Sequence, residues 1–162
     1  MKKTKKIGLV SHDAKKSDML DWVRFNAGSL ARHKLICTGT TGQLVAELFK
    51  IEFPNLKPDL TRLNSGPLGG DQQMGALIAD GELDILIFFT DPMTTQPHDV
   101  DVKALVRLCV VYNTVIACNK ATADYVISSP LFKEHYAPVV HDYSTYLMRE
   151  TVVHDVSARE IR

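Results

Sequence analysis

Short apolar runs recur along the chain and alternate with longer stretches whose apolar residues are spaced three or four positions apart. The apolar runs cover residues 7–11, 35–38, 60–64, 85–90 and 114–118. Runs of this length predict β-strands, and all of them except residues 60–64 are β-branched or strongly apolar. The intervening stretches predict helices at residues 17–27, 43–49, 72–79, 102–112 and 121–127, and a C-terminal helix at residues 143–153.

Alternation of strands and helices at this spacing is typical of βαβ units. We therefore predict an α/β fold, a single Rossmann-like domain with a five-stranded, mainly parallel sheet and helices on both faces. The 162 residues suffice for one domain, 1–162, in which residues from about 150 to 162 form a polar C-terminal extension. Ligands of such sheets bind at the carboxyl ends of the strands, so the loops that follow the strands deserve inspection.

The composition is that of an ordinary globular protein, with 45% hydrophobic and 23% charged residues. Lys and Arg together number 19, as do Asp and Glu, so the balanced charge predicts no nucleic-acid partner and no anionic membrane partner. The chain has no apolar run long enough to span a bilayer and no signal-peptide pattern. Three cysteines, Cys37, Cys109 and Cys118, lack close metal-ligand spacing and are interpreted as reduced thiols of a cytoplasmic protein.

The loop after the third predicted strand, residues 65–75, reads S-G-P-L-G-G-D-Q-Q-M-G. Glycines before a helix bring backbone N–H groups and the positive helix end close to a ligand, which favours an anion. Ser65 and Gly66 add further donors. Asp71 either caps the helix or removes a proton from the bound molecule, and the loop alone leaves both roles open.

The loop after the second strand, Thr38-Gly39-Thr40-Thr41-Gly42, supplies three hydroxyls and two glycines before a helix, which favours phosphate. It is not a P-loop, because no Lys follows Gly42, and G-x-G-x-x-G occurs after no strand, which argues against a dinucleotide. After the first strand, His12, Asp13 and Lys16 are candidates for binding a phosphate and a carbonyl group. The alternative is that Asp13 or Ser17 caps the next helix.

The loop after the fourth strand carries His98 and Asp101 just before a helix. At the same sheet edge as Asp71, these side chains outline an acid/base constellation. The alternative is that Asp99 caps this helix. The spacing of His98 and Asp101 repeats with no other ligands, so we predict no metal site.

Together these segments resemble the methylglyoxal synthase family. The resemblance rests on His12-Asp13, on the 38–42 loop, and on three longer blocks: S-G-P-L-G-G-D-Q-Q at 65–73, F-F-T-D-P at 88–92 and P-H-D-V-D-V-K-A-L at 97–105. It covers residues 6 to 149. The S-G-P-x-G-G-D-Q-Q and P-H-D-x-D-V-x-A-L blocks are highly specific in combination.

The resemblance implies a lyase that converts dihydroxyacetone phosphate to methylglyoxal and inorganic phosphate. It also implies that this reaction bypasses part of glycolysis and needs no cofactor and no metal. It implies that Asp71 is the general base, that His98 shuttles protons at the enediolate oxygens, and that Asp101 supports it. The implied substrate-binding residues are His12, Lys16, Thr38, Gly39, Thr40, Thr41, Ser65, Gly66 and His98.

The same resemblance implies a cytoplasmic homohexamer that inorganic phosphate inhibits allosterically, with Arg149 as the best match for an interface arginine. The alternative function is a non-catalytic, anion-binding regulatory domain of the same fold, as at the C-terminus of large carbamoyl phosphate synthetases. Such a module needs the phosphate loops but not Asp71, His98 and Asp101 in acid/base roles.

Overall fold

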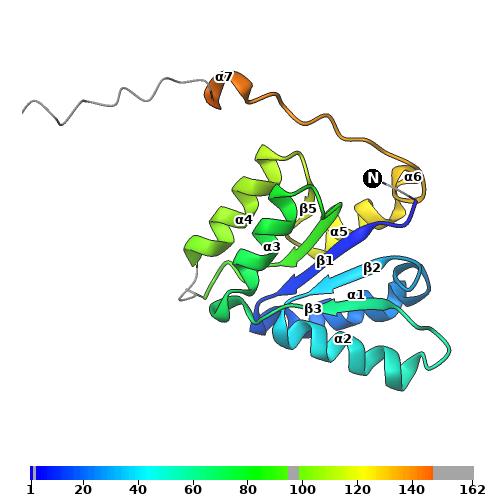
Figure 1. The fold of residues 1–162 in the computed structure, drawn as a ribbon. Coiled ribbons are helices and arrows are strands. Elements are labelled where there is room, and N and C mark those ends of the chain that lie inside the picture. Colours follow the sequence, from blue (N-terminus) through cyan, green and yellow to red (C-terminus); the bar gives the residue numbers. More distant parts are fainter. Residues whose placement is uncertain (2, 95–98, 148–162) are drawn as a thin grey trace, which may run out of the picture.

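The computed structural model describes residues 1, 3–94 and 99–147 (Figure 1). Its strands are β1 (Lys6–Ser11), β2 (Lys34–Cys37), β3 (Asp59–Arg62), β4 (Ile85–Phe89) and β5 (Val115–Ala117). Its α-helices are α1 (Lys16–Leu30), α2 (Gly39–Glu52), α3 (Gly70–Ala79), α4 (Asp99–Val111), α5 (Lys120–Ser128), α6 (Pro130–Lys133) and α7 (Ser144–Leu147). Two 3-10 helices, η1 (Asp13–Lys15) and η2 (Gly66–Leu68), precede α1 and α3.

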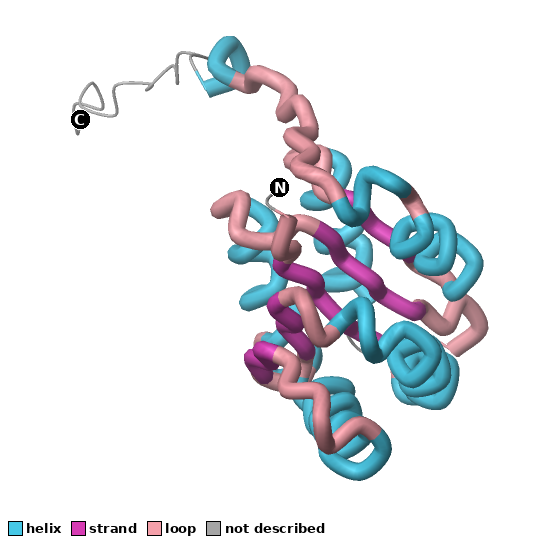
Figure 2. The backbone as a smooth tube through the Cα atoms, turned by 90° about the vertical axis from the view of Figure 1, so that its right-hand side faces the viewer, coloured by secondary structure: helices cyan, strands magenta, loops and turns pink. Residues whose placement is uncertain are grey.

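The five strands form one sheet in the order β3-β2-β1-β4-β5, and all four pairings are parallel. Helices α1, α2 and α5 cover one face and α3 and α4 cover the other (Figure 1). Figure 2 shows the strands as a layer between helices. The predicted α/β class, the parallel sheet and its two helical layers are therefore confirmed.

Alternate residues of each central strand feed two apolar clusters, one on each face of the sheet. In β1, Ile7 and Leu9 pack with Trp22 and the other buried side chains of α1 and α2. Val10 packs on the opposite face with Met74 of α3. Period-two alternation in a strand buried on both faces explains why β1 and β4 read as continuous apolar runs in the sequence.

Each predicted strand lies within two residues of an observed one, but some helix predictions differ from the structure. Helix α2 starts at Gly39, four residues before the predicted start at Gln43. The short helix α6 was not predicted, although the Ser129 hydroxyl accepts the Leu131 N–H and Pro130 takes the first helical position. Of the predicted helix 143–153, the described residues show only α7.

His33 is buried between the starts of β1 and β2. Its Nδ1 accepts the Lys5 backbone N–H at 3.0 Å, and its ring meets Phe132 edge-on with centroids 4.9 Å apart. Burial, and then the positive charges of Lys5 and Arg32, lower the pKa of His33 below its ordinary 6.5. The folded state therefore holds His33 neutral at pH values where the unfolded chain begins to bind a proton.

We expect the stability contribution of neutral His33 to be present above about pH 6.5 and to be lost as the pH falls towards the lowered pKa. The unfolded state binds more protons in that window, so stability must rise with pH. His33→Gln keeps an acceptor for the Lys5 N–H and removes the titration. Thermal melts from pH 8 to pH 5.5 should show a shallower decline for this variant, whereas the control His141→Gln, at an exposed site, should keep the wild-type slope. Equal slopes in all three proteins would contradict the prediction.

Candidate active site

The loops that follow the central strands meet at one edge of the sheet, beside the reversal of strand order between β1 and β4. Such a reversal opens a crevice in parallel sheets. Here it forms a cavity of about 380 Å³. Every predicted site residue among those described lines this cavity, except Gly39 and Asp101. The lining consists of Val10, Ser11, His12, Asp13, Lys16, Thr38, Thr40, Thr41, Ser65, Gly66, Pro67, Asp71 and Phe88.

Hydroxyl groups and a helix N-terminus converge on this cavity. Thr40 and Thr41 lie in the first turn of α2, where backbone N–H groups lack intrahelical acceptors. Thr38 and Ser65 occupy the N-cap positions of α2 and η2, yet neither side chain makes a capping hydrogen bond. The hydroxyls of this loop could instead have served as a threonine cap of the helix, and the structure shows no such cap at Thr38. These donors suit the oxygens of a phosphate.

Gly39 brings the second and third of these loops into contact. Its N–H donates to the carbonyl oxygens of Leu63 at 3.2 Å and Asn64 at 3.0 Å. A Cβ built on Gly39 would lie 2.6 Å from Ser65 Cα, so only glycine permits this approach. Because its N–H is already donated, Gly39 acts here by close packing. Its contact with substrate stays a prediction.

Asp71 is the second residue of α3 and is 3% exposed. The N-cap of this helix is Gly69, which has φ +96°, so Asp71 does not hold the capping position that the sequence left open. A Cβ on Gly66 would lie 2.9 Å from Asp71 Oδ2. The absence of a side chain at Gly66 therefore lets the Asp71 carboxylate lie against the loop that lines the cavity.

His12, which follows β1, contacts the loop after β4 through its side chain. The backbone N–H of Asp91 donates to His12 Nδ1 at 2.9 Å, and the ring packs edge-on against Phe88 with centroids 5.2 Å apart. A backbone N–H is always a donor, so Nδ1 acts as an acceptor and the neutral ring carries its proton on Nε2. This tautomer makes His12 a hydrogen-bond donor in the cavity wall.

Lys16 is the cation that lines the cavity. It opens α1, its ammonium lies 3.5 Å from the Ser11 carbonyl oxygen, and it forms an ion pair with Asp13. The Asp13 side chain is almost fully exposed, so this pair contributes little to stability and leaves Lys16 available to an anion. Neither Asp13 nor Ser17 caps α1, whose N-cap residue is Lys15.

Asp101 lies in the first turn of α4. Asp71 and Asp101 line a separate hollow of about 350 Å³ between α3 and α4. Asp101 thus shares this second hollow with Asp71 and does not line the cavity of about 380 Å³. His98 and Arg149 lie outside the described residues, so their predicted roles stay predictions.

The sequence analysis did not predict two hydrogen bonds that hold the loops of the site in place. Gln73 Oε1 accepts the Asn64 backbone N–H at 2.9 Å and so holds the loop that carries Asp71. Asp91 contributes through its backbone, as described for His12, while hydrogen bonds from Thr94 and the Met93 N–H hold the pKa of its own carboxyl below the usual range. Position within a specific motif marked Gln73 and Asp91, but their partners are set by the fold.

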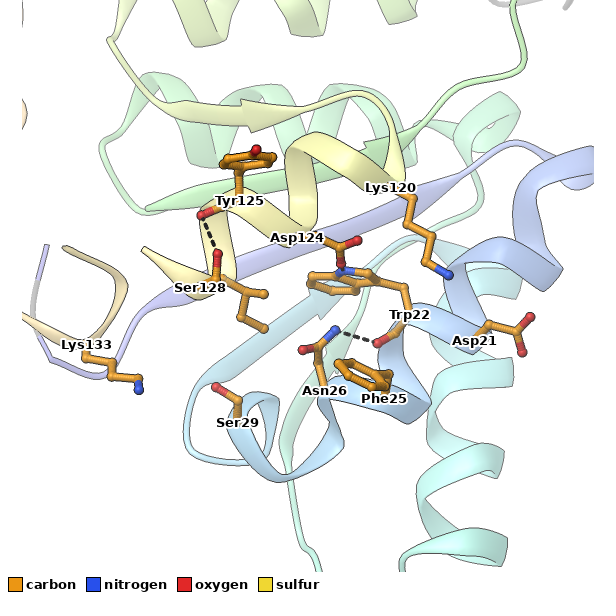
Figure 3. A pocket seen from close by; sticks show the side chains of 11 residues that line it. Asp21, Trp22, Phe25, Asn26, Ser29, Lys120, Asp124, Tyr125, Ser128 and Lys133 are labelled. Atoms are coloured by element: carbon orange, nitrogen blue, oxygen red, sulfur yellow. Dashed lines mark hydrogen bonds between the residues drawn. The ribbon is translucent and has the colours of Figure 1, made fainter. Parts of the chain in front are cut away.

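A larger hollow of about 720 Å³ lies between α1 and α5 and shares no lining residue with the candidate active site (Figure 3). Trp22 Nε1 donates to Asp124 Oδ1 at 2.9 Å on one side of it, and the rings of Phe25 and Tyr125 are largely exposed. Its lining lacks the clustered hydroxyls and glycines of the smaller cavity. Size alone therefore does not mark the candidate active site.

Within the described ranges, no three His, Cys, Asp or Glu side chains gather as metal ligands would. No helix in that part of the chain is long and apolar enough to cross a membrane. The three cysteines are free, and burial raises the pKa of Cys37 and of Cys109 to about 12. These two thiols are therefore protonated near neutral pH and poor nucleophiles.

A family model described as MGS-like domain matches residues 18–118. A methylglyoxal synthase of Leptospira interrogans is 50% identical over 146 residues, covering 90% of this chain and 94% of the relative. That of Proteus mirabilis is 50% identical over 143 residues, covering 88% and 90%. The crystal structure of methylglyoxal synthase from Elizabethkingia anophelis superposes with a TM-score of 0.83 at 51% identity, covering 93% of this chain and 94% of that one. By sequence and by fold, this chain belongs to the methylglyoxal synthase family.

Proposed function

We propose that this protein is a lyase that converts dihydroxyacetone phosphate to methylglyoxal and inorganic phosphate through an enediolate. The observation that carries the proposal is the meeting of a buried carboxylate, Asp71, with phosphate-type donors in one cavity of about 380 Å³. Family membership supports the same reaction.

Asp71 acts as the general base in this proposal. It takes a proton from the hydroxymethyl carbon next to the ketone, and the electron pair moves onto the carbonyl oxygen to form the enediolate. The Nε2–H group of His12 is a donor suited to this oxygen, and preorganised donors at a developing negative charge lower the barrier. His98 moves protons between the enediolate oxygens and Asp101 supports it, as the family resemblance implies.

Phosphate then leaves with the electrons of its C–O bond, and the enol product rearranges to methylglyoxal. Lys16 and the donors of Thr38, Thr40, Thr41, Ser65 and Gly66 hold the phosphate before and after this step, and Gly39 holds the two loops together. Elimination competes with reprotonation unless the C–O bond stands roughly perpendicular to the enediolate plane. We propose that these loops set that torsion.

The wider properties proposed for the protein follow the same resemblance. They are a single domain with a polar extension from about residue 150, a cytoplasmic location, a homohexameric assembly and allosteric inhibition by inorganic phosphate. Gel filtration with light scattering tests the assembly, and phosphate titration of the initial rate tests the inhibition.

A cofactor-free assay tests the reaction directly. Purified protein is mixed with dihydroxyacetone phosphate, and methylglyoxal and inorganic phosphate are followed together. We expect the two products to appear in equal amounts. Binding of phosphate without release of either product would contradict the proposed activity and favour a regulatory module.

Thr40→Ala is expected to loosen the grip on the phosphate and raise the ratio of proton exchange or isomerisation to elimination. Turnover in D₂O, followed by NMR of recovered dihydroxyacetone phosphate, glyceraldehyde phosphate and methylglyoxal, measures that ratio. Thr61→Ala, at an exposed threonine of β3 outside the cavity, should behave as wild type. A Thr40→Ala variant with weaker binding but an unchanged ratio would rule out torsional control by Thr40.

A further inference from the structure

Ser11, the last residue of β1, lies between two of the groups proposed to hold the phosphate. Its hydroxyl oxygen is 3.1 Å from Thr41 Oγ1 in the first turn of α2, and its carbonyl oxygen is 3.5 Å from the Lys16 ammonium. The exposed fractions of Ser11 and Thr41 are 8% and 3%, and both residues line the cavity. The family resemblance assigned no role to Ser11.

The direction of the Ser11–Thr41 hydrogen bond depends on what occupies the cavity. Each hydroxyl has one proton to donate and can also accept. An unprotonated phosphate oxygen beside Thr41 can only accept, so Thr41 must aim its proton at that oxygen. Thr41 Oγ1 then accepts from Ser11, which leaves a chain that runs from Ser11 through Thr41 to the anion. Hydrogen bonds in such a chain strengthen one another, most of all in a buried site.

We propose that Ser11 is a positioning residue that orients the Thr41 hydroxyl as a donor to the phosphate group. The inference rests on the proposed function of this cavity as a phosphate site. Without the Ser11 hydroxyl, Thr41 loses a buried partner and is free to rotate its proton away from the anion. The carbonyl of Ser11 remains in any substitution, so its contact with Lys16 is preserved and the hydroxyl is tested alone.

A double-mutant cycle read by inorganic phosphate binding tests the proposal. Calorimetry is performed on wild type, Ser11→Ala, Thr41→Val and the double variant. We expect Ser11→Ala to weaken phosphate binding by about three- to tenfold, as for loss of one hydrogen bond. The double variant should bind no more weakly than Thr41→Val, because Ser11 acts through the Thr41 hydroxyl. Ser11→Thr, which keeps a hydroxyl at this position, should retain much of the wild-type affinity.

Two matched backgrounds separate this role from a structural one. In Thr41→Ser, which keeps a hydroxyl, adding Ser11→Ala should again weaken binding, whereas in Thr41→Ala it should not. If Thr41→Val does not fold, the comparison of the Thr41→Ser and Thr41→Ala backgrounds replaces the double-mutant cycle. An unchanged affinity in Ser11→Ala, or losses that add fully in the double variant, would overturn the proposal.

Substrate kinetics distinguish failure of this inference from failure of the proposed function. Ser11→Ala should raise KM for dihydroxyacetone phosphate more than it lowers kcat. A wild-type protein that binds phosphate but releases no methylglyoxal would overturn the proposed reaction, yet the calorimetric cycle would still decide the role of Ser11.

Discussion

Replacing Asp71 with Asn should lower kcat for methylglyoxal formation by about 10²- to 10⁴-fold, the usual contribution of a general base. The substitution keeps the shape of a residue that is 3% exposed and removes its ability to take the substrate proton. Phosphate affinity should be retained, because the hydroxyls, the helix N-terminus and Lys16 are untouched. The measurement is the initial rate of methylglyoxal release, together with calorimetric titration of phosphate.

Asp80→Asn is the matched control, since Asp80 follows the other end of the same helix and is exposed. Its turnover should equal that of wild type. Near-normal turnover in Asp71→Asn would show that another group takes the proton. Loss of both turnover and phosphate binding would instead show that the Asp71 carboxylate holds the loop in place.

Gly70→Ala should be the most damaging of the small substitutions in this chain. A Cβ at position 70 would lie 2.1 Å from the carbonyl oxygen of Asn64 and 2.9 Å from the carbonyl carbon of Ser65. These are backbone atoms, so no side-chain rotation relieves the clash. We expect a free-energy loss of about 3 kcal/mol or more, together with a large fall in turnover, because Asp71 is the next residue.

Gly28→Ala, the same change at another glycine, should instead raise the stability of the protein. Gly28 lies within α1, and a Cβ there would have no atom within 4 Å. Alanine in a helix interior is favoured over glycine by roughly 0.5–1 kcal/mol, so this variant should melt at a higher temperature than wild type. Melts at one protein concentration compare the two variants. A Gly70→Ala protein with wild-type stability and turnover would show that the loop adjusts to the new side chain.

The strands were predictable because burial on both faces of a parallel sheet demands continuous apolar segments. β3 is the exception, because its residues are mostly exposed and it lies at the sheet edge. The run that predicted it, residues 60–64, accordingly mixes polar and apolar residues. The start of α2 was predicted too late because glycine and threonine are poor helix formers. There, contacts of Gly39 with Leu63, Asn64 and Ser65 outweigh local propensity.

The candidate site was predictable as a set of residue types in specific blocks. Three hydroxyls and two glycines before one helix favour a phosphate, and a lone carboxylate among glycines before another could act as a base beside it. Roles of these residues as helix caps were also consistent with the sequence. They were excluded for Thr38 and Asp71 only by the observed cap positions and hydrogen bonds.

The class of fold, the strands and the chemical groups available to the site could be read from the amino-acid sequence, because they follow from local periodicity and residue type. Which of these groups face one another depends on the three-dimensional packing. The contact of His12 with the Asp91 N–H joins residues 79 positions apart, and that of Ser11 with Thr41 joins residues 30 apart. Contacts between residues so far apart in the chain depend on strand order and helix packing. These are set by many weak contacts across the whole core, which no local sequence pattern encodes.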